Sequence, residues 1–234
     1  MPDPVAAGEL SQEQLRKVEE FIEEEEGSFN RYKGWLAVFL AAVAVASSAF
    51  HLYAAKEIVR TDLLREIHVG IVLFLSYMMF PAAKRFRHRL MWWDVILALA
   101  AVASIAYMVI GGDDFLDRTT SPNTWDQVFG IALIALVIEA TRRTSGWVMP
   151  VIIGAFIAYA FAGPWLPSPW THRGYDVGRL VGHMYMTLEG IFGTAVDVSA
   201  TLIILFTIYG AFLQYSGAGR FFLDFSFEIG RAHV

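Results

Sequence analysis

Charged side chains at helical spacing are the first candidates for chemistry in this sequence. Glu139 lies three residues before Arg142 and four before Arg143, so the three side chains share one face of a helix. The favoured interpretation is an ion pair at the membrane interface, with the arginines extended toward the membrane surface. A coupling or substrate role is the alternative, because acids within apolar segments are functional candidates.

The histidines do not follow the pattern of a metal site. His172 and His183 lack a third ligand at a suitable spacing, and no H-E-x-x-H sequence occurs. His51 and His68 each stand alone near the end of an apolar segment, where packing or interfacial hydrogen bonding accounts for them. Because Cys, a G-x-S-x-G elbow and a phosphate-binding loop are also absent, the sequence predicts no catalytic residue, no metal, no cofactor and no enzyme.

The composition is that of a membrane protein. Of 234 residues, 56% are hydrophobic and 18% are charged, and the long apolar runs carry no polar stripe. The formal net charge of −5 arises in residues 1–34, which hold nine acidic and four basic side chains. Basic residues are outnumbered and do not gather on an aromatic-studded strand or helix, which argues against a nucleic-acid surface. The predicted fold class is an all-α polytopic membrane protein.

Six apolar segments are long enough to cross a bilayer. Three of them have 19 residues, roughly 28 Å as helices, against a hydrocarbon core of about 30 Å. About six transmembrane helices are therefore predicted, at Trp35–Tyr53, Leu63–Ala83, Trp92–Ile110, Trp125–Thr141, Trp147–Trp165 and Val198–Tyr215.

Local signals predict further structure between and before these spans. Ser11 and Gln14 form a capping box for a helix in the acidic segment 1–34. A second box, Thr124 with Gln127, starts the fourth span, and the sequence GGDD before it predicts a polar turn. An external amphipathic helix is expected to lie along the outer surface or to pack on neighbouring spans rather than to cross. Its apolar face is marked by Val177, Leu180, Val181, Met184, Tyr185 and Leu188.

The distribution of Lys and Arg predicts the orientation, because short cytoplasmic segments are enriched in them. With the amino terminus inside, 12 of the 18 basic residues fall in cytoplasmic segments, including KRFRHR at 84–89 and the pair after Glu139. We therefore expect a cytoplasmic N-terminus and a fifth span that runs from inside to outside.

Several short sequences in fixed order resemble one transporter family. They are AFHLYAA, Arg65-x-x-His68-x-Gly70, EATRR, HRGY, EGIFG, VSAT and GAFLQYSGAGRFF. Over nearly all of residues 30–226 the chain looks like the fused membrane subunit of tripartite ATP-independent periplasmic (TRAP) transporters, and most like the TAXI branch.

The resemblance implies a division of the chain into modules. Residues 1–34 would be a cytoplasmic acidic segment, and 35–143 a four-span module like the small TRAP subunit. Residues 144–166 would be a connecting transmembrane helix. Residues 167–227 would open the large permease module with the amphipathic helix and a first span. The last residues, 228–234, resemble a translated sequencing adapter, so they are expected to be a non-native tail on a truncated chain.

The same resemblance implies a transport function. A permease in a bacterial or archaeal cytoplasmic membrane would import an organic anion, such as a dicarboxylate, keto acid or amino acid, that a soluble extracytoplasmic binding protein delivers. A sodium or proton gradient would drive uptake. This chain would be mainly scaffold in contact with membrane lipids and with the rest of the large module, where the substrate and ion sites are expected.

No substrate-binding residue is therefore assigned within the chain. Scaffold or docking roles are assigned to nine residues: Arg65, His68, Glu139, Arg142, Arg143, His172, Arg173, Tyr175 and Glu189. A local structural turn is favoured over docking for the three at 172, 173 and 175. Two other classes stay open, namely a membrane scaffold without transport and, less favoured, a membrane-embedded enzyme.

The predicted orientation is tested by tags at two loops. Tags near Ser121 and near Pro167 are expected to react with an impermeant reagent in intact cells, because both loops are assigned to the outside. A tag near Arg87 is the control and is expected to react only after lysis. Labelling of both loop tags only from the cell interior would contradict the assignment.

Overall fold

The part of the chain that the structure describes is helical. The computed structural model describes residues 32–83 and 90–231, and no strand occurs in these two ranges. Its elements are α2 (Trp35–Lys56), α3 (Thr61–Met79), α4 (Trp92–Asp117), α5 (Thr124–Ser145), α6 (Val148–Ala162), the short helix η2 (Gly163–Trp165), α7 (Val177–Tyr185), α8 (Thr194–Val198), the π-helical turn η3 (Ser199–Ile203), α9 (Ile204–Tyr215) and α10 (Ala218–Arg231). The predicted N-terminal helix and the KRFRHR sequence lie outside the described residues.

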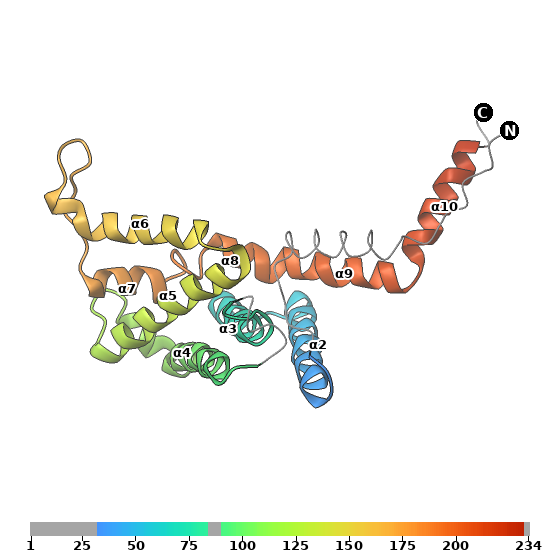
Figure 1. The fold of residues 1–234 in the computed structure, drawn as a ribbon, viewed down its shortest axis with the longest axis horizontal. Helices are drawn as coiled ribbons and strands as arrows, with labels where there is room; N and C mark the ends of the chain where they lie inside the picture. Colours follow the sequence, from blue (N-terminus) through green and yellow to red (C-terminus); the bar gives the residue numbers. More distant parts are fainter. Residues whose placement is uncertain (1–31, 84–89, 232–234) are drawn as a thin grey trace.

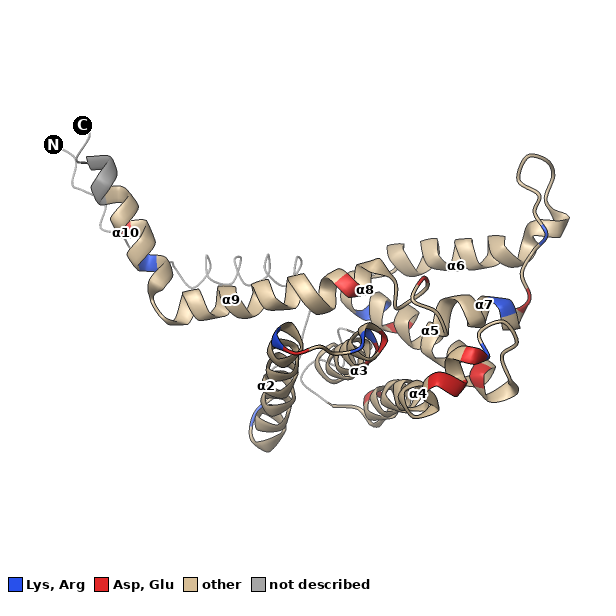
Figure 2. Cartoon of the chain, turned by 180° about the vertical axis from the view of Figure 1, so that it is seen from behind, with Lys and Arg blue, Asp and Glu red and all other residues tan. Residues whose placement is uncertain are grey.

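Five stretches are long and apolar enough to span a membrane: α2, α4, α5, α6 with η2, and the continuous run from α8 to α9. Charged side chains gather near helix ends, while α6 and α9 carry none along their lengths (Figure 2). Large apolar side chains remain exposed on these helices, Trp35, Val151 and Phe206 among them. A soluble protein would bury such surface, and lipid covers it in a membrane. The all-α, polytopic membrane fold is confirmed.

Helix α3 is the second predicted span, and it is not one of these five stretches. It has the expected length, but Asp62, Arg65 and Glu66 lie near its start. It ends at Met79, four residues earlier than predicted, because Phe80 adopts an extended conformation before Pro81. The helix packs against α2, α4, α5 and α8, so its polar residues face protein.

The sequence GGDD does not form the predicted turn. Helix α4 continues through it to Asp117, with a break at Gly112, whose φ of 51° and ψ of −133° are not helical. Two contacts hold the added segment in place: Phe115 is buried, and Arg118 Nη1 donates to the Asp114 carbonyl at 2.7 Å. A positive φ at glycine costs little, so α4 kinks there and consists of two helical segments.

The capping box of α5 lies one residue earlier than the sequence predicted. Asn123 Oδ1 accepts hydrogen bonds from the backbone N–H groups of Trp125 and Asp126, and the Asp126 carboxylate accepts from Asn123 N–H. The prediction of Thr124 with Gln127 was wrong because Asn and Asp can form the same reciprocal pair. Arg118 and Tyr107 also donate to Asp126, which is fully buried.

The predicted amphipathic helix is α7, capped by Asp176, whose side chain accepts from Arg179 N–H at 2.8 Å. It packs on the spans. Val181 and Tyr185 are buried against α5, and the Tyr185 hydroxyl donates to the Ser104 carbonyl of α4 at 2.6 Å. The helix ends at Tyr185, so Leu188 lies beyond it and is exposed.

The helices form a packed group from which the end of the chain projects. In Figure 1, α2 to α8 lie together, α9 extends away from them, and α10 bends off at its far end. The first part of the α8–α9 run contacts α2 and α3. The start of this run is therefore the region where residues late in the sequence meet the first two helices.

Gly130 of α5 is expected to tolerate no side chain. A Cβ atom there would lie 2.5 Å from Val181 Cγ1 and 2.9 Å from Tyr185 Cδ1, whereas a Cβ on Gly154 of α6 would meet nothing within 4 Å. Gly130→Ala should lower the free energy of unfolding by about 1–3 kcal/mol because α7 must move. Gly154→Ala is the control and should leave it unchanged. Thermal unfolding in detergent measures both, and equal melting temperatures would refute the packing of α7 on α5.

Candidate functional site

The start of α3 is joined to α8 by an ion pair between distant parts of the sequence. Arg65 Nε and Nη2 each lie 3.0 Å from Asp197 Oδ1, and Arg65 Nη1 donates to the Phe192 carbonyl at 2.9 Å. The Arg65 side chain is 12% exposed. Because one guanidinium satisfies both a carboxylate and a backbone carbonyl, it fixes the position of α8 relative to α3.

A second connection starts at His68, one turn further along α3. His68 Nε2 lies 3.1 Å from Ser199 Oγ, and His68 Nδ1 lies 3.0 Å from His51 Nε2. His51 Nδ1 lies 2.7 Å from the Ser47 carbonyl oxygen. Both imidazoles are buried. The prediction that each histidine stands alone was therefore wrong, since the two side chains form one chain of hydrogen bonds from α2 to η3.

The Ser47 carbonyl sets the direction of this chain. A carbonyl oxygen only accepts, so the proton of His51 is on Nδ1, and its Nε2 accepts from His68 Nδ1–H. His68 Nε2 is then an acceptor, and Ser199 donates its hydroxyl proton to it. When both imidazoles are neutral, each ring nitrogen has one hydrogen-bonding partner, and only one set of donors and acceptors satisfies all of them. The contact between α2, α3 and η3 is therefore geometrically specific.

These contacts bring together sequences that were noted separately. AFHLYAA supplies His51, the Arg-x-x-His pattern supplies Arg65 and His68, and the segment from EGIFG to VSAT supplies the Phe192 carbonyl, Asp197 and Ser199. Ser199 opens the π-helical turn η3. Such turns are common at functional sites. We use the name junction cluster for the Ser47 carbonyl together with five side chains, those of His51, Arg65, His68, Asp197 and Ser199.

The pair Arg142 and Arg143 forms a second polar cluster, near the end of α5. Glu139 accepts from Arg142 Nε at 2.7 Å and from Arg143 Nε at 2.8 Å, so the predicted shared face is confirmed. Arg143 does not extend toward the membrane surface, because it also donates to Asp94 of α4 at 2.7 Å, and both side chains are 2% exposed. The two charges therefore compensate each other inside the protein.

The two arginines also donate hydrogen bonds to backbone carbonyls just after the end of α3. Arg143 Nη1 donates to the Phe80 carbonyl at 3.2 Å and Arg142 Nη2 to the Ala82 carbonyl at 2.9 Å. The Arg143 guanidinium lies 4.9 Å from the centre of the Tyr77 ring, and the Tyr77 hydroxyl donates to the Leu136 carbonyl. The end of α3 is thus fastened to α5, as its start is fastened to α8.

The remaining assigned residues do not join either cluster. His172 folds back on α6, where its Nε2 donates to the Tyr159 carbonyl and its Nδ1 accepts from Gly174 N–H. Arg173 and Tyr175 are exposed. Glu189 is exposed too, 3.9 Å from His183 Nδ1. The docking role of these residues stays a prediction.

Sequence reasoning missed three hydrogen-bonding partners in these clusters: Asp94, Asp197 and Ser199. A carboxylate at the edge of an apolar segment was the available signal for the two aspartates, because an acid at that position requires a cation. Ser199 carried no signal, since a hydroxyl in an apolar helix commonly bonds its own backbone. The hydrogen bonds of these groups join α3 to α2, α8 and η3 and join α4 to α5, so the arrangement supports contact between helices.

Comparison with protein families gives one match. Residues 132–233 match the model of the tripartite ATP-independent periplasmic transporter, DctM component. The match starts within α5 and covers less than half of the chain, including Asp197 and Ser199. Comparisons with curated proteins and with solved structures find no match. The family match supports a membrane permease component of a TRAP transporter, which is not an enzyme.

The ion pair between Arg143 and Asp94 is expected to be important for stability. Asp94→Asn leaves the buried guanidinium with one carboxylate shared between two arginines, and should lower the free energy of unfolding by about 3 kcal/mol. Asp113→Asn is the matched control on α4, because the Asp113 side chain is 87% exposed. It should change stability by about 0.5 kcal/mol or less. Thermal unfolding in detergent compares them, and similar losses would show that the buried pair contributes nothing specific.

Proposed function

We propose that this chain is the scaffold part of a TRAP-type permease that imports an organic anion. The junction cluster carries the proposal. Its Arg65 and His68 precede the range that matches the DctM component, whereas Asp197 and Ser199 lie within it. A buried, directional set of hydrogen bonds across that boundary is what a fixed support for a moving transport domain requires.

The proposed modules follow the predicted boundaries. Residues 1–34 are a cytoplasmic segment, 35–143 a four-span module, 144–166 a connecting helix, and 167–227 the opening of the large module. The match of residues 132–233 to the DctM component supports a permease component for the later part of the chain. Contacts of α3 with α8 and of α2 with α9 support a fixed connection between the four-span module and the opening of the large module.

The proposed partners and location come from the family. An extracytoplasmic solute-binding protein delivers the anion, which is a dicarboxylate, a keto acid or an amino acid, and a sodium or proton gradient drives uptake. The membrane is the cytoplasmic membrane, the N-terminus is inside, and TAXI is the proposed branch. The exposed Arg173 and Tyr175 are available for contact with the binding protein.

Uptake by whole cells tests the proposal. The complete reading frame and the binding protein are expressed in a host without its own uptake of labelled dicarboxylates, keto acids or glutamate. Accumulation of one of them should need both proteins and should cease when the ion gradients are collapsed. Uptake that is equal with and without the permease would leave only the alternative of a scaffold without transport.

The junction cluster makes a prediction of its own. Arg65→Ala should reduce uptake at least tenfold, since it removes the cation that holds Asp197 and the Phe192 carbonyl. Asp197→Ala should have a similar effect, and the double variant should be no worse than either single change because they share one interaction. Lys56→Ala is the control, because that side chain is 83% exposed. Additive losses in the double variant would contradict a shared role.

A further inference from the structure

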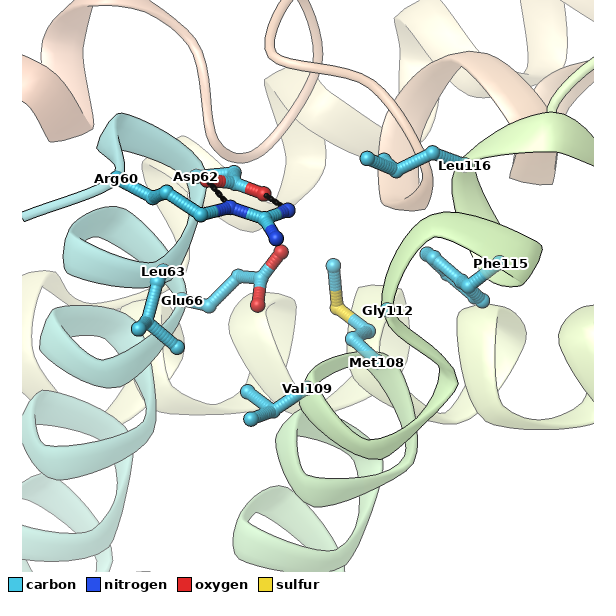
Figure 3. Close-up of a pocket in the computed structure, with 9 residues that line it drawn as sticks. All are labelled: Arg60, Asp62, Leu63, Glu66, Met108, Val109, Gly112, Phe115 and Leu116. Carbon is cyan, nitrogen blue, oxygen red and sulfur yellow. Dashed lines mark hydrogen bonds and ion pairs between the residues drawn. The ribbon is translucent and has the colours of Figure 1, made fainter.

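A cavity of about 170 Å³ lies between the start of α3 and the last turns of α4. Its apolar wall includes Leu63, Met108 and Phe115, and its polar wall consists of Arg60, Asp62 and Glu66. Figure 3 shows the charged side chains on one side of this space and the α4 residues on the other. A water molecule occupies about 30 Å³, so the cavity has room for an ion and a few waters.

The charges around the cavity do not cancel. Arg60 donates to both oxygens of Asp62, so this guanidinium and this carboxylate compensate each other. Its other contact is with Asp113, at 3.5 Å. Glu66 is left over as a carboxylate at the beginning of a membrane helix, where an uncompensated charge is costly.

Glu66 is directed into the cavity without a partner. The residue is 7% exposed, and no donor or cation in the described part of the chain lies within hydrogen-bond or ion-pair distance of its carboxylate. Figure 3 shows that carboxylate pointing into the space between Arg60 and Met108. An ionised carboxylate that faces a cavity without a partner is costly, and either a bound cation or protonation removes that cost.

The break in α4 adds a second attraction for a cation. Gly112 lines the cavity, as do Met108 and Val109 of the turn before it. Its non-helical φ and ψ end the first segment of α4 at this point. The last carbonyl oxygens of a helical segment have no amide donors within that segment. The end of a helical segment carries a partial negative charge, and carbonyl and carboxylate oxygens are the ligands of hard cations.

We propose that this cavity binds a sodium ion, with Glu66 as the charged ligand and backbone carbonyls at the Gly112 break as neutral ligands. One uncompensated carboxylate matches one positive charge, which favours a monovalent ion. Within residues 32–83 and 90–231 no group of three or more His, Cys, Asp or Glu could hold a metal. A group of three such residues is typical of metal ions that are held mainly by side chains. In the proposed site, backbone oxygens supply most of the ligands instead. The site belongs to the first module and does not depend on transport.

Sodium-dependent stability of the purified chain tests the site. N-methyl-D-glucamine chloride is replaced by sodium chloride at constant ionic strength and pH 8, and the melting temperature is followed in detergent. Wild type should gain about 3–6 °C once sodium exceeds its Kd tenfold. Glu66→Gln keeps the size of the side chain but removes its charge, and should lose this gain. Glu57→Gln, at an exposed residue outside the cavity, should keep it.

Three results would overturn the proposal. They are a wild-type melting temperature independent of sodium, a gain that persists in Glu66→Gln, and a wild type that responds to acidification but not to sodium, which would identify a protonated carboxyl. If Glu66→Gln does not fold, Glu66→Asp takes its place in the test, because it keeps the negative charge but shortens the side chain by one methylene. Its half-saturating sodium concentration should rise at least fivefold, and an unchanged value would equally reject Glu66 as a ligand.

Discussion

Buried charge inside apolar helices is the constraint on which the rest of this structure depends. The hydrocarbon region offers no water to solvate an ion, so each charged side chain within a membrane helix needs an opposite charge or a set of dipoles. Arg143 and Asp94 meet this need by pairing with each other, both almost fully buried. A pairing of this kind has one geometry, and it fixes the packing of α4 on α5 where apolar contacts alone would permit sliding.

Helix α3 shows how such pairs organise the whole group of helices. Its start is connected to α8 through Arg65 and its end to α5 through the Phe80 carbonyl, with His68 adding a link to η3. Each link joins residues at least 60 positions apart, so the helix is held by the later part of the chain. This explains how a predicted span with three charged side chains near its start is accommodated among other helices.

The junction cluster crosses the start of the range that matches the DctM component. Directional hydrogen bonds between buried groups resist sliding better than apolar contacts, so the cluster holds α8 and η3 against α2 and α3. Helix α9 differs, because it extends away from the group with its apolar side chains exposed. The α8–α9 run therefore has two parts. Its start contacts α2 and α3, and the side chains further along it are exposed.

The sequence by itself determined the helices and the class of protein. Periodicity and length are local properties, so the apolar runs, the Glu139–Arg143 face and the helix of α7 were predictable from residues near one another. Only the tertiary structure decided which polar groups meet. Nothing in the spacing of His51, His68 and Ser199 relates them, and the partner of Arg143 is 49 residues away. The bend at Gly112 also depends on tertiary structure. The two glycines predict a turn, but the chain is helical again beyond the bend, where Phe115 is buried.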